Sequence, residues 1–72
     1  MLAAMVHIGK SLKRQRTLKA VTQAQLAERA GVTTATVARI ERDEIEPRMT
    51  TLRKLADALD VEPAELVGVV EG

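Results

Sequence analysis

The side chains best suited to chemistry in this sequence lie close together between Thr33 and Arg39. Arg39 carries a guanidinium whose parallel N–H donors match the O6 and N7 acceptors of guanine. Thr33 and Thr34 each offer a hydroxyl and a methyl group, and Ala35 and Ala38 can contact only the methyl group of thymine. Side chains of these kinds, on an exposed helix face, could reach the edges of bases in duplex DNA. The chemistry they predict is therefore recognition, with Arg39 carrying most of the specificity.

Nothing else in the sequence predicts an active site. There is no glycine-rich phosphate loop, no nucleophile with a base and an orienting partner, and 72 residues leave little volume for a substrate pocket. The chain has no cysteine, and the single histidine, His7, cannot form a zinc site alone. We therefore expect no enzyme activity, no catalytic residue, no cofactor and no metal site.

A capped helix and a glycine turn precede these recognition residues. Thr22 supplies an N-cap hydroxyl, and Gln25 three residues later completes the pattern of a capping box. Gly31 is expected to end this helix in the left-handed conformation. The side chains of Thr22 and Gln23 lie where the outward-pointing amides of a helix N-terminus favour an anion, so both are candidate contacts to the DNA backbone.

A second capped helix follows at once and presents the recognition residues. Thr33 is its expected N-cap, and Val37 and Ile40 face inward. Two helices joined by so short a turn cross steeply, which leaves one of them free to enter the major groove. Thr36 on this helix could reach a phosphate. An alternative for Arg39 is a pair with a phosphate or with a carboxylate such as Asp43.

The rest of the chain predicts helices and no strand. A basic helix is expected over residues 6–19, with Ile8 and Leu12 facing inward. Leucines and an alanine at three- and four-residue spacing predict an amphipathic helix over residues 49–59. Pro63 suits the first position of a short last helix over residues 61–66. The sequence thus predicts an all-α fold, a compact five-helix bundle in one domain spanning residues 1–72, with residues 1–7 as an extension and 67–72 as a tail.

Charge is divided between the two halves of the chain. Up to Ile40 there are seven basic residues and one acidic residue, whereas from Glu41 onward there are four basic and nine acidic residues. A phosphate-facing first half and a solvated or partner-facing second half would explain this division. Arg42 and Arg48, on either side of the loop after the recognition helix, are further candidate contacts to the DNA backbone. The alternative is that the helix faces simply carry mixed, solvated charges.

Composition narrows the class of partner. The chain has no aromatic residue, so the stacking on which single-strand binding relies is impossible and duplex DNA is the better partner. No segment approaches the roughly 20 apolar residues of a membrane span, and the N-terminal residues do not resemble a signal peptide. The sequence therefore predicts a soluble cytoplasmic protein.

Taken together, these segments resemble the phage repressor and Cro-like family of helix-turn-helix DNA-binding proteins. The resemblance covers nearly the whole chain, and its specificity lies in the order of many short matches. The matching segments are Ile8-Gly9, Arg16, Thr22-Gln23-Ala24-Gln25-Leu26-Ala27, Ala30-Gly31-Val32, Val37-Ala38-Arg39-Ile40-Glu41-Arg42, Pro47, and Leu52-Arg53-Lys54-Leu55-Ala56-Asp57-Ala58-Leu59.

The resemblance implies a five-helix bundle that is usually dimeric on DNA and reads the major groove with the second helix of its motif, which corresponds here to residues 34–42. It implies that Gln23 contacts the DNA backbone or a neighbouring base. It also implies a structural ion pair between Arg16 and Glu41. The expected protein is a sequence-specific transcription regulator, such as a phage or plasmid repressor, a restriction-modification controller or an antitoxin.

Four positions depart from the family pattern. Gln15 replaces a customary leucine on the inner side of the first helix, and Leu18 is expected to fill the space left by Gln15. Ala20 and Asp43 stand where glycines are common in the family. Aspartate tolerates left-handed backbone geometry better than most residues. Arg48 replaces a customary small capping residue.

The end of the chain is apolar beyond what one short helix can hide, and exposed apolar surface usually marks an interface. We expect Leu66, Val67, Val69 and Val70 to form the interface of a homodimer, which would bind two half-sites about 34 Å apart. The alternatives are a frayed end, a fragment of a longer protein, or a different protein bound through this tail. A bundle that has lost DNA binding and serves as a protein-interaction adaptor is the competing function.

Overall fold

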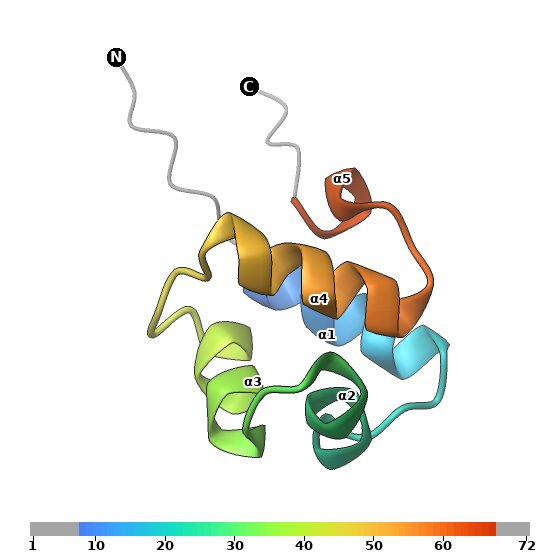
Figure 1. Cartoon of the computed structure of the whole chain (residues 1–72), viewed down its shortest axis with the longest axis horizontal. Helices are drawn as coiled ribbons and strands as arrows, with labels where there is room; N and C mark the ends of the chain where they lie inside the picture. Colours follow the sequence, from blue (N-terminus) through green and yellow to red (C-terminus); the bar gives the residue numbers. More distant parts are fainter. Residues whose placement is uncertain (1–7, 68–72) are drawn as a thin grey trace.

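Five helices joined by short segments make up residues 8–67, the part of the chain that the computed structural model describes (Figure 1). They are α1 (Gly9–Leu18), α2 (Gln23–Ala30), α3 (Thr34–Glu41), α4 (Met49–Leu59) and α5 (Pro63–Leu66). No strand occurs among these residues. The predicted all-α class and the order of the five helices are confirmed, while His7 and the expected extension over residues 1–7 lie outside the described residues.

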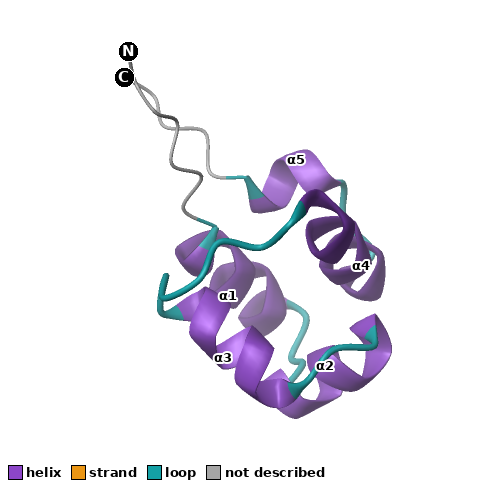
Figure 2. Ribbon diagram, turned by 60° about the vertical axis from the view of Figure 1, so that its left-hand side comes forward, coloured by secondary structure: helices purple, strands orange, loops and turns teal. Residues whose placement is uncertain are grey.

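One apolar core holds the helices together. Helix α2 packs against both α3 and α4, α1 packs against α3 and α5, and α4 packs against α5 (Figure 2). Each helix contributes at least one almost completely buried aliphatic side chain; the largest are Ile8, Leu12, Leu26, Val37, Ile40, Leu55 and Leu66. Burying a side chain of this size contributes about 1.5 to 3 kcal/mol. These contacts fix where the α2–α3 motif lies.

The start of α1 is closely packed against the end of α3. A Cβ atom on Gly9 would lie 2.7 Å from the carbonyl oxygen of Glu41 and 2.9 Å from that of Ile40. The amide of Gly9 donates to Oδ1 of Asp43 at 3.2 Å. Only glycine allows the two backbones to approach this closely without displacement.

Helix α1 differs from its prediction in two respects. It spans Gly9–Leu18, shorter than the predicted residues 6–19, because Ile8 and Lys19 are its caps. Leu18 does not fill space beside Gln15, because its side chain is 68% exposed. It lies six positions after the buried Leu12, which places it about 120° around the helix from the core face. The expectation for Leu18 is therefore wrong, and an apolar side chain stands on the outer face of α1.

Left-handed backbone geometry ends several of these helices. Gly31 has φ of 73° at the end of α2, as expected. Ala20 and Asp43, which replace the customary glycines, adopt φ of 55° and 58°. Asp60, at the end of α4, also has φ of 58° and was not anticipated. These turns therefore keep left-handed backbone angles even where glycine is absent. The Cβ atom of a non-glycine residue makes that conformation sterically unfavourable.

The predicted bounds of the later helices agree closely with the structure. Helix α4 spans the predicted residues 49–59, and Pro63 occupies the first turn of α5 as expected. The longest helix among residues 8–67 is α4, and none of them has the length and apolar character needed to cross a membrane.

Candidate nucleic-acid interface

The outer face of α3 carries the predicted recognition residues. Thr34, Ala35 and Arg39 are exposed, and Ala38 is half-buried beside them. Val37 and Ile40 are buried in the core and fix the rotation of the helix about its axis. The structure thus brings the four candidate side chains of α3 to one surface, where a planar base edge could meet them.

Thr33 begins α3 and has a defined local role. Its Oγ1 accepts from the amide of Thr36 at 3.1 Å and lies 2.8 Å from Oγ1 of Thr36. The Thr33 hydroxyl is therefore engaged in capping, and its methyl group is the part left to contact a base. Thr36 is half-buried, and its hydroxyl belongs to the same cap.

The N-terminus of α2 lies next to this surface and is closed by a capping box. Oγ1 of Thr22 accepts from the amide of Gln25 at 3.0 Å, and Oε1 of Gln25 accepts from the amide of Thr22 at 2.9 Å. The predicted capping box is confirmed. It fixes the first turn of α2, whose remaining amides can still attract an anion.

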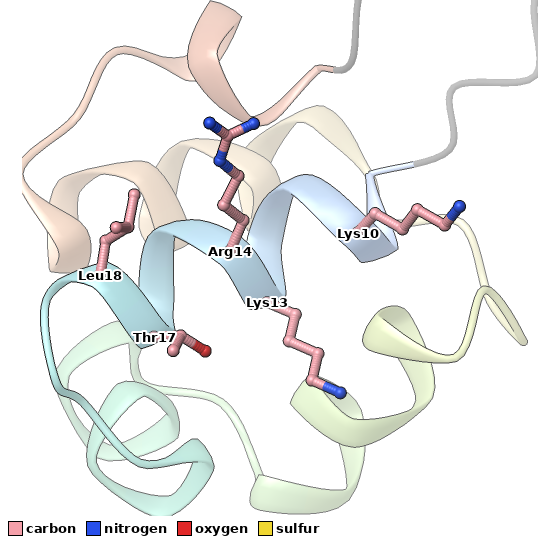
Figure 3. A pocket seen from close by; sticks show the side chains of 5 residues that line it. All are labelled: Lys10, Lys13, Arg14, Thr17 and Leu18. Carbon is pink, nitrogen blue, oxygen red and sulfur yellow. The ribbon is translucent and has the colours of Figure 1, made fainter.

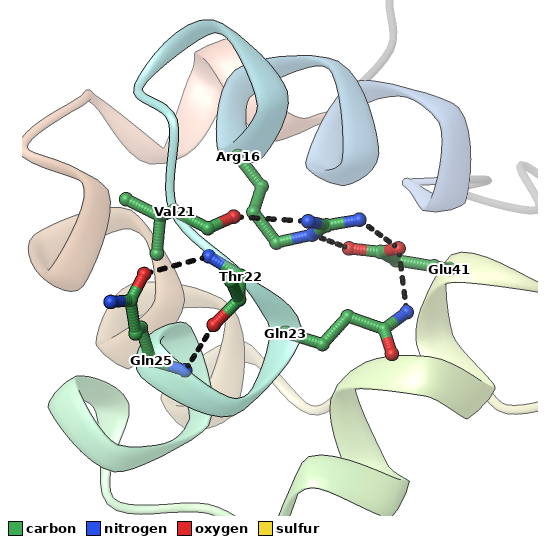
Figure 4. A network of polar contacts seen from close by, with 6 residues as sticks. All are labelled: Arg16, Val21, Thr22, Gln23, Gln25 and Glu41. Atoms are coloured by element: carbon green, nitrogen blue, oxygen red, sulfur yellow. Dashed lines mark hydrogen bonds and ion pairs between the residues drawn. The ribbon is translucent and has the colours of Figure 1, made fainter.

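A polar network centred on Glu41 joins α1, α2 and α3 (Figure 4). Nε and Nη2 of Arg16 donate to the two carboxylate oxygens of Glu41 at 2.6 and 3.0 Å, and Nη1 donates to the carbonyl of Val21 at 3.0 Å. Nε2 of Gln23 donates to Oε1 of Glu41 at 3.0 Å. The expected ion pair is present, and the contact to Gln23 is an addition that the sequence did not reveal.

The ion pair in this network is largely shielded from solvent. The side chains of Arg16 and Glu41 are only 14% and 4% exposed. Burial alone would raise the pKa of Glu41, but the hydrogen bonds from Arg16 and Gln23, with the nearby charges of Arg16 and Lys13, lower it below 4.5. The hydrogen bond to Glu41 likewise raises the pKa of Arg16. Both groups therefore stay charged near neutral pH, and the pair remains fixed.

The Glu41 contact determines how Gln23 presents its amide. One of the two Nε2 protons points to Glu41, so the other proton and Oε1 remain for an external partner. A side chain already held in one orientation loses less entropy when it binds. Gln23 thus combines a structural contact with a position suited to a phosphate.

The two arginines expected near the loop after α3 differ in their surroundings. Arg42 is exposed and donates to both carboxylate oxygens of Glu44, through Nε at 2.7 Å and Nη2 at 3.2 Å. The hydrogen bond from Arg42 and the charges of Arg42 and Arg39 lower the pKa of Glu44. Arg48 is the exposed N-cap of α4 and makes no side-chain cap hydrogen bond. A phosphate would have to displace Glu44 before it could bind Arg42 in the same way.

The acidic residues after α3 are thus partly used inside the protein. Asp43 accepts from the amide of Gly9, and Glu44 binds Arg42. The sequence suggested Asp43 as a partner for Arg39 and as a residue that tolerates left-handed geometry, but not as an acceptor for the amide of Gly9. The adjacent opposite charges of Arg42 and Glu44 were a signal for their pair, whereas nothing near Asp43 in the sequence indicated a partner 34 positions away.

The residues expected at a dimer interface fall into three groups. Leu66 is completely buried in the core of the chain, so it has no surface to offer a second copy, and this part of the expectation is wrong. The side chain of Leu66 belongs to the core cluster and anchors α5 onto the other helices. Val67 is half-buried and packs against the core. Val69 and Val70 lie outside the described residues.

Known proteins resemble this chain over most of its length. It is 38% identical over 61 residues to the immunity repressor protein of Bacillus phage phi105, a match that covers 85% of this chain and 42% of the relative. The chain thus spans less than half the length of that repressor.

Two solved structures share the fold. The restriction-modification controller protein C.AhdI from Aeromonas hydrophila superposes with a TM-score of 0.81 at 38% identity, covering 85% of this chain and 92% of that one. The P22 c2 repressor protein, in complex with a synthetic operator, gives a TM-score of 0.78 at 30% identity, covering 83% of this chain and 91% of that one.

The family HTH_3, helix-turn-helix, matches residues 12–66, which include the whole α2–α3 motif and the core helices on both sides of it. Its members are regulators of transcription and not enzymes. From the sequence match, the shared fold and the surface presented by α3, the chain belongs to the HTH_3 family of DNA-binding helix-turn-helix proteins, of the Cro and C1 repressor type.

Proposed function

We propose that this chain regulates transcription by binding a specific site in double-stranded DNA, with α3 in the major groove. The observation that carries the proposal is the outer face of α3, where Thr34, Ala35 and Arg39 are exposed while the opposite face is buried. An α-helix of this kind fits the width of the major groove. The P22 c2 repressor, whose solved structure includes an operator, supports the same kind of partner.

Arg39 is the main base-reading residue in this proposal. Its guanidinium can donate two hydrogen bonds to O6 and N7 of guanine, a contact that discriminates by about 1 to 3 kcal/mol. Thr34 adds one hydroxyl, and the methyl groups of Thr33, Ala35 and Ala38 suit thymine. The recognised half-site should therefore contain one strongly selected guanine beside weaker preferences for thymine.

The DNA backbone is held by residues on both sides of α3. Gln23 and Thr22 bind one phosphate at the N-terminus of α2, where the helix dipole favours an anion. Thr36, Arg42 and Arg48 bind phosphates on the other strand or further along the groove. These contacts set the register of α3 and make binding sensitive to salt.

A homodimer would place two copies of α3 in successive turns of the major groove, about 34 Å apart on a pseudo-palindromic operator. We assign the apolar residues Val67, Val69 and Val70 to the dimer contact, because they follow directly after the core residue Leu66. This function requires access to DNA, which agrees with the cytoplasmic location expected from the sequence.

Selection from a random duplex library at about physiological salt, followed by anisotropy on the enriched sequence, tests the proposal. A pseudo-palindrome with half-sites one turn apart, bound with a steep salt slope, is expected. Arg39→Ala should weaken binding about tenfold and relax the preference at one base pair, whereas Arg53→Ala, an exposed arginine on α4, should not relax any preference. Absence of enrichment would exclude the proposal for this chain and favour a protein-interaction adaptor.

A further inference from the structure

The outer face of α1 forms a second surface, to which none of the individual DNA contacts proposed above is assigned. A shallow hollow of about 340 Å³ lies there, lined by Lys10, Lys13, Arg14, Thr17 and Leu18 (Figure 3). We call these five residues the α1 groove. Leu18 and Arg14 point to one side of the helix, and Lys13 and Thr17 point to the other.

The spacing of these residues suits a second helix. Lys10, Arg14 and Leu18 follow one another at four-residue intervals and form a ridge, and Lys13 and Thr17 form the neighbouring ridge. The groove between two such ridges is the place where a ridge of another helix packs. Helices α3 and α5 pack against α1, and the lining residues belong to α1 alone, so the groove lies on its outer side.

The basic and apolar side chains of the groove favour a partner helix that has acidic residues beside an apolar stripe. Three of the five lining residues are basic, none is acidic, and α1 contains no acidic residue at all. Leu18 supplies an exposed apolar anchor, which would be of little use against a phosphate backbone. Carboxylates on a partner helix could pair with Lys10, Lys13 and Arg14 while its apolar side chains cover Leu18 and the stems beside it.

This charge pattern argues against two other occupants. Two copies of α1 packed across a two-fold axis would bring the same cations face to face, which is unfavourable. Residues 1–7 of this chain include no acidic residue, so they could not supply the carboxylates. We propose that the α1 groove is a docking site for an acidic amphipathic helix of another protein, through which the regulator is controlled or recruits a partner.

The experiment is an NMR titration of the full-length ¹⁵N-labelled chain with a synthetic acidic amphipathic peptide, helical and with leucines along one face. Amide shifts should be largest over residues 10–18 and small over α3. Leu18→Ser should weaken binding about tenfold, because an exposed leucine that becomes buried by the peptide is lost. Met49→Ser, a change at a similarly exposed apolar residue on α4, should leave binding unchanged.

A second peptide with serines in place of the leucines keeps the charge and should bind much more weakly. Equal binding of the two peptides, or equal binding by Leu18→Ser, would show general charge attraction and overturn the proposal. Shifts centred on α3 would show that the peptide merely imitates DNA, and would also overturn it. Self-association of the chain that Leu18→Ser abolishes would make a second copy the occupant. Each of these results is independent of whether the chain binds an operator.

Discussion

The two ends of α3 are held in different ways. At its start, Thr33 caps the helix through contacts with Thr36, three residues away. At its end, Glu41 and the following Asp43 bind residues of α1 and α2 that lie 18 to 34 positions away in the sequence. The start of α3 is therefore determined locally, whereas its direction relative to the bundle depends on long-range contacts made at its end.

The largest effect should come from breaking the long-range contacts. Glu41→Ala leaves Arg16 buried with no carboxylate partner, and we expect it to reduce the free energy of unfolding by about 3 kcal/mol. Thr33→Ala, which removes only the local cap, should reduce it by about 1 kcal/mol. Urea unfolding of the two variants measures both values. Equal losses would contradict the distinction between the two ends of α3.

Closing the space between α1 and α3 should have the next largest effect. Gly9→Ala places a Cβ atom against two backbone carbonyl oxygens of α3, which cannot move independently, so we expect a loss of about 1 to 3 kcal/mol. Thr17→Ala, on the exposed side of the same helix, should change the stability by less than about 0.5 kcal/mol. A stable Gly9→Ala protein would show that α1 can shift without disturbing α3.

Acid should weaken the end of α3 before its start. The pKa of Glu41 is lower in the folded chain than its ordinary value of 4.5, so its contribution to stability is complete above pH 4.5 and is lost as the pH falls through the folded pKa. The difference in melting temperature between the wild type and Glu41→Gln should therefore shrink in this range. A difference that stays constant down to about pH 3 would contradict this assignment.

The smallest effect concerns the exposed pair just beyond α3. Glu44→Gln removes the carboxylate that occupies Arg42, and we expect little change in stability, because exposed pairs contribute little. Operator affinity should rise severalfold and the salt dependence should become steeper, since Arg42 is then available to a phosphate. Anisotropy across a salt series measures both. The rise should be absent in Arg42→Ala/Glu44→Gln.

The same contrast explains what the sequence could predict. The capping box of Thr22, the turn at Gly31 and the bounds of α4 depend on residues close together in the chain, and their patterns were sufficient. The Arg16–Glu41 pair was expected only through resemblance to a family. The contacts of Gln23 with Glu41 and of Gly9 with Asp43 arise once the helices are packed, and no local pattern encodes them.

The predicted dimer contact shows where an apolar sequence pattern is misleading. The apolar residues at the end of the chain suggested one continuous interface, yet Leu66 is required by the core. Hydrophobicity alone cannot distinguish a side chain that faces its own bundle from one that faces a partner. Likewise, the apolar side chain of Leu18 suggested a place in the core, and only the packing of α1 showed that it is exposed.

The Glu41 network also bears on how such a protein changes its target. The single buried carboxylate of Glu41 links α1, α2 and α3 through its hydrogen bonds. None of these hydrogen bonds involves Thr34, Ala35 or Arg39. The surface that we propose to read bases is therefore separate from the polar network that holds α3 in place. Under the proposed function, new side chains on the outer face of α3 should change the preferred operator and leave the Glu41 network intact.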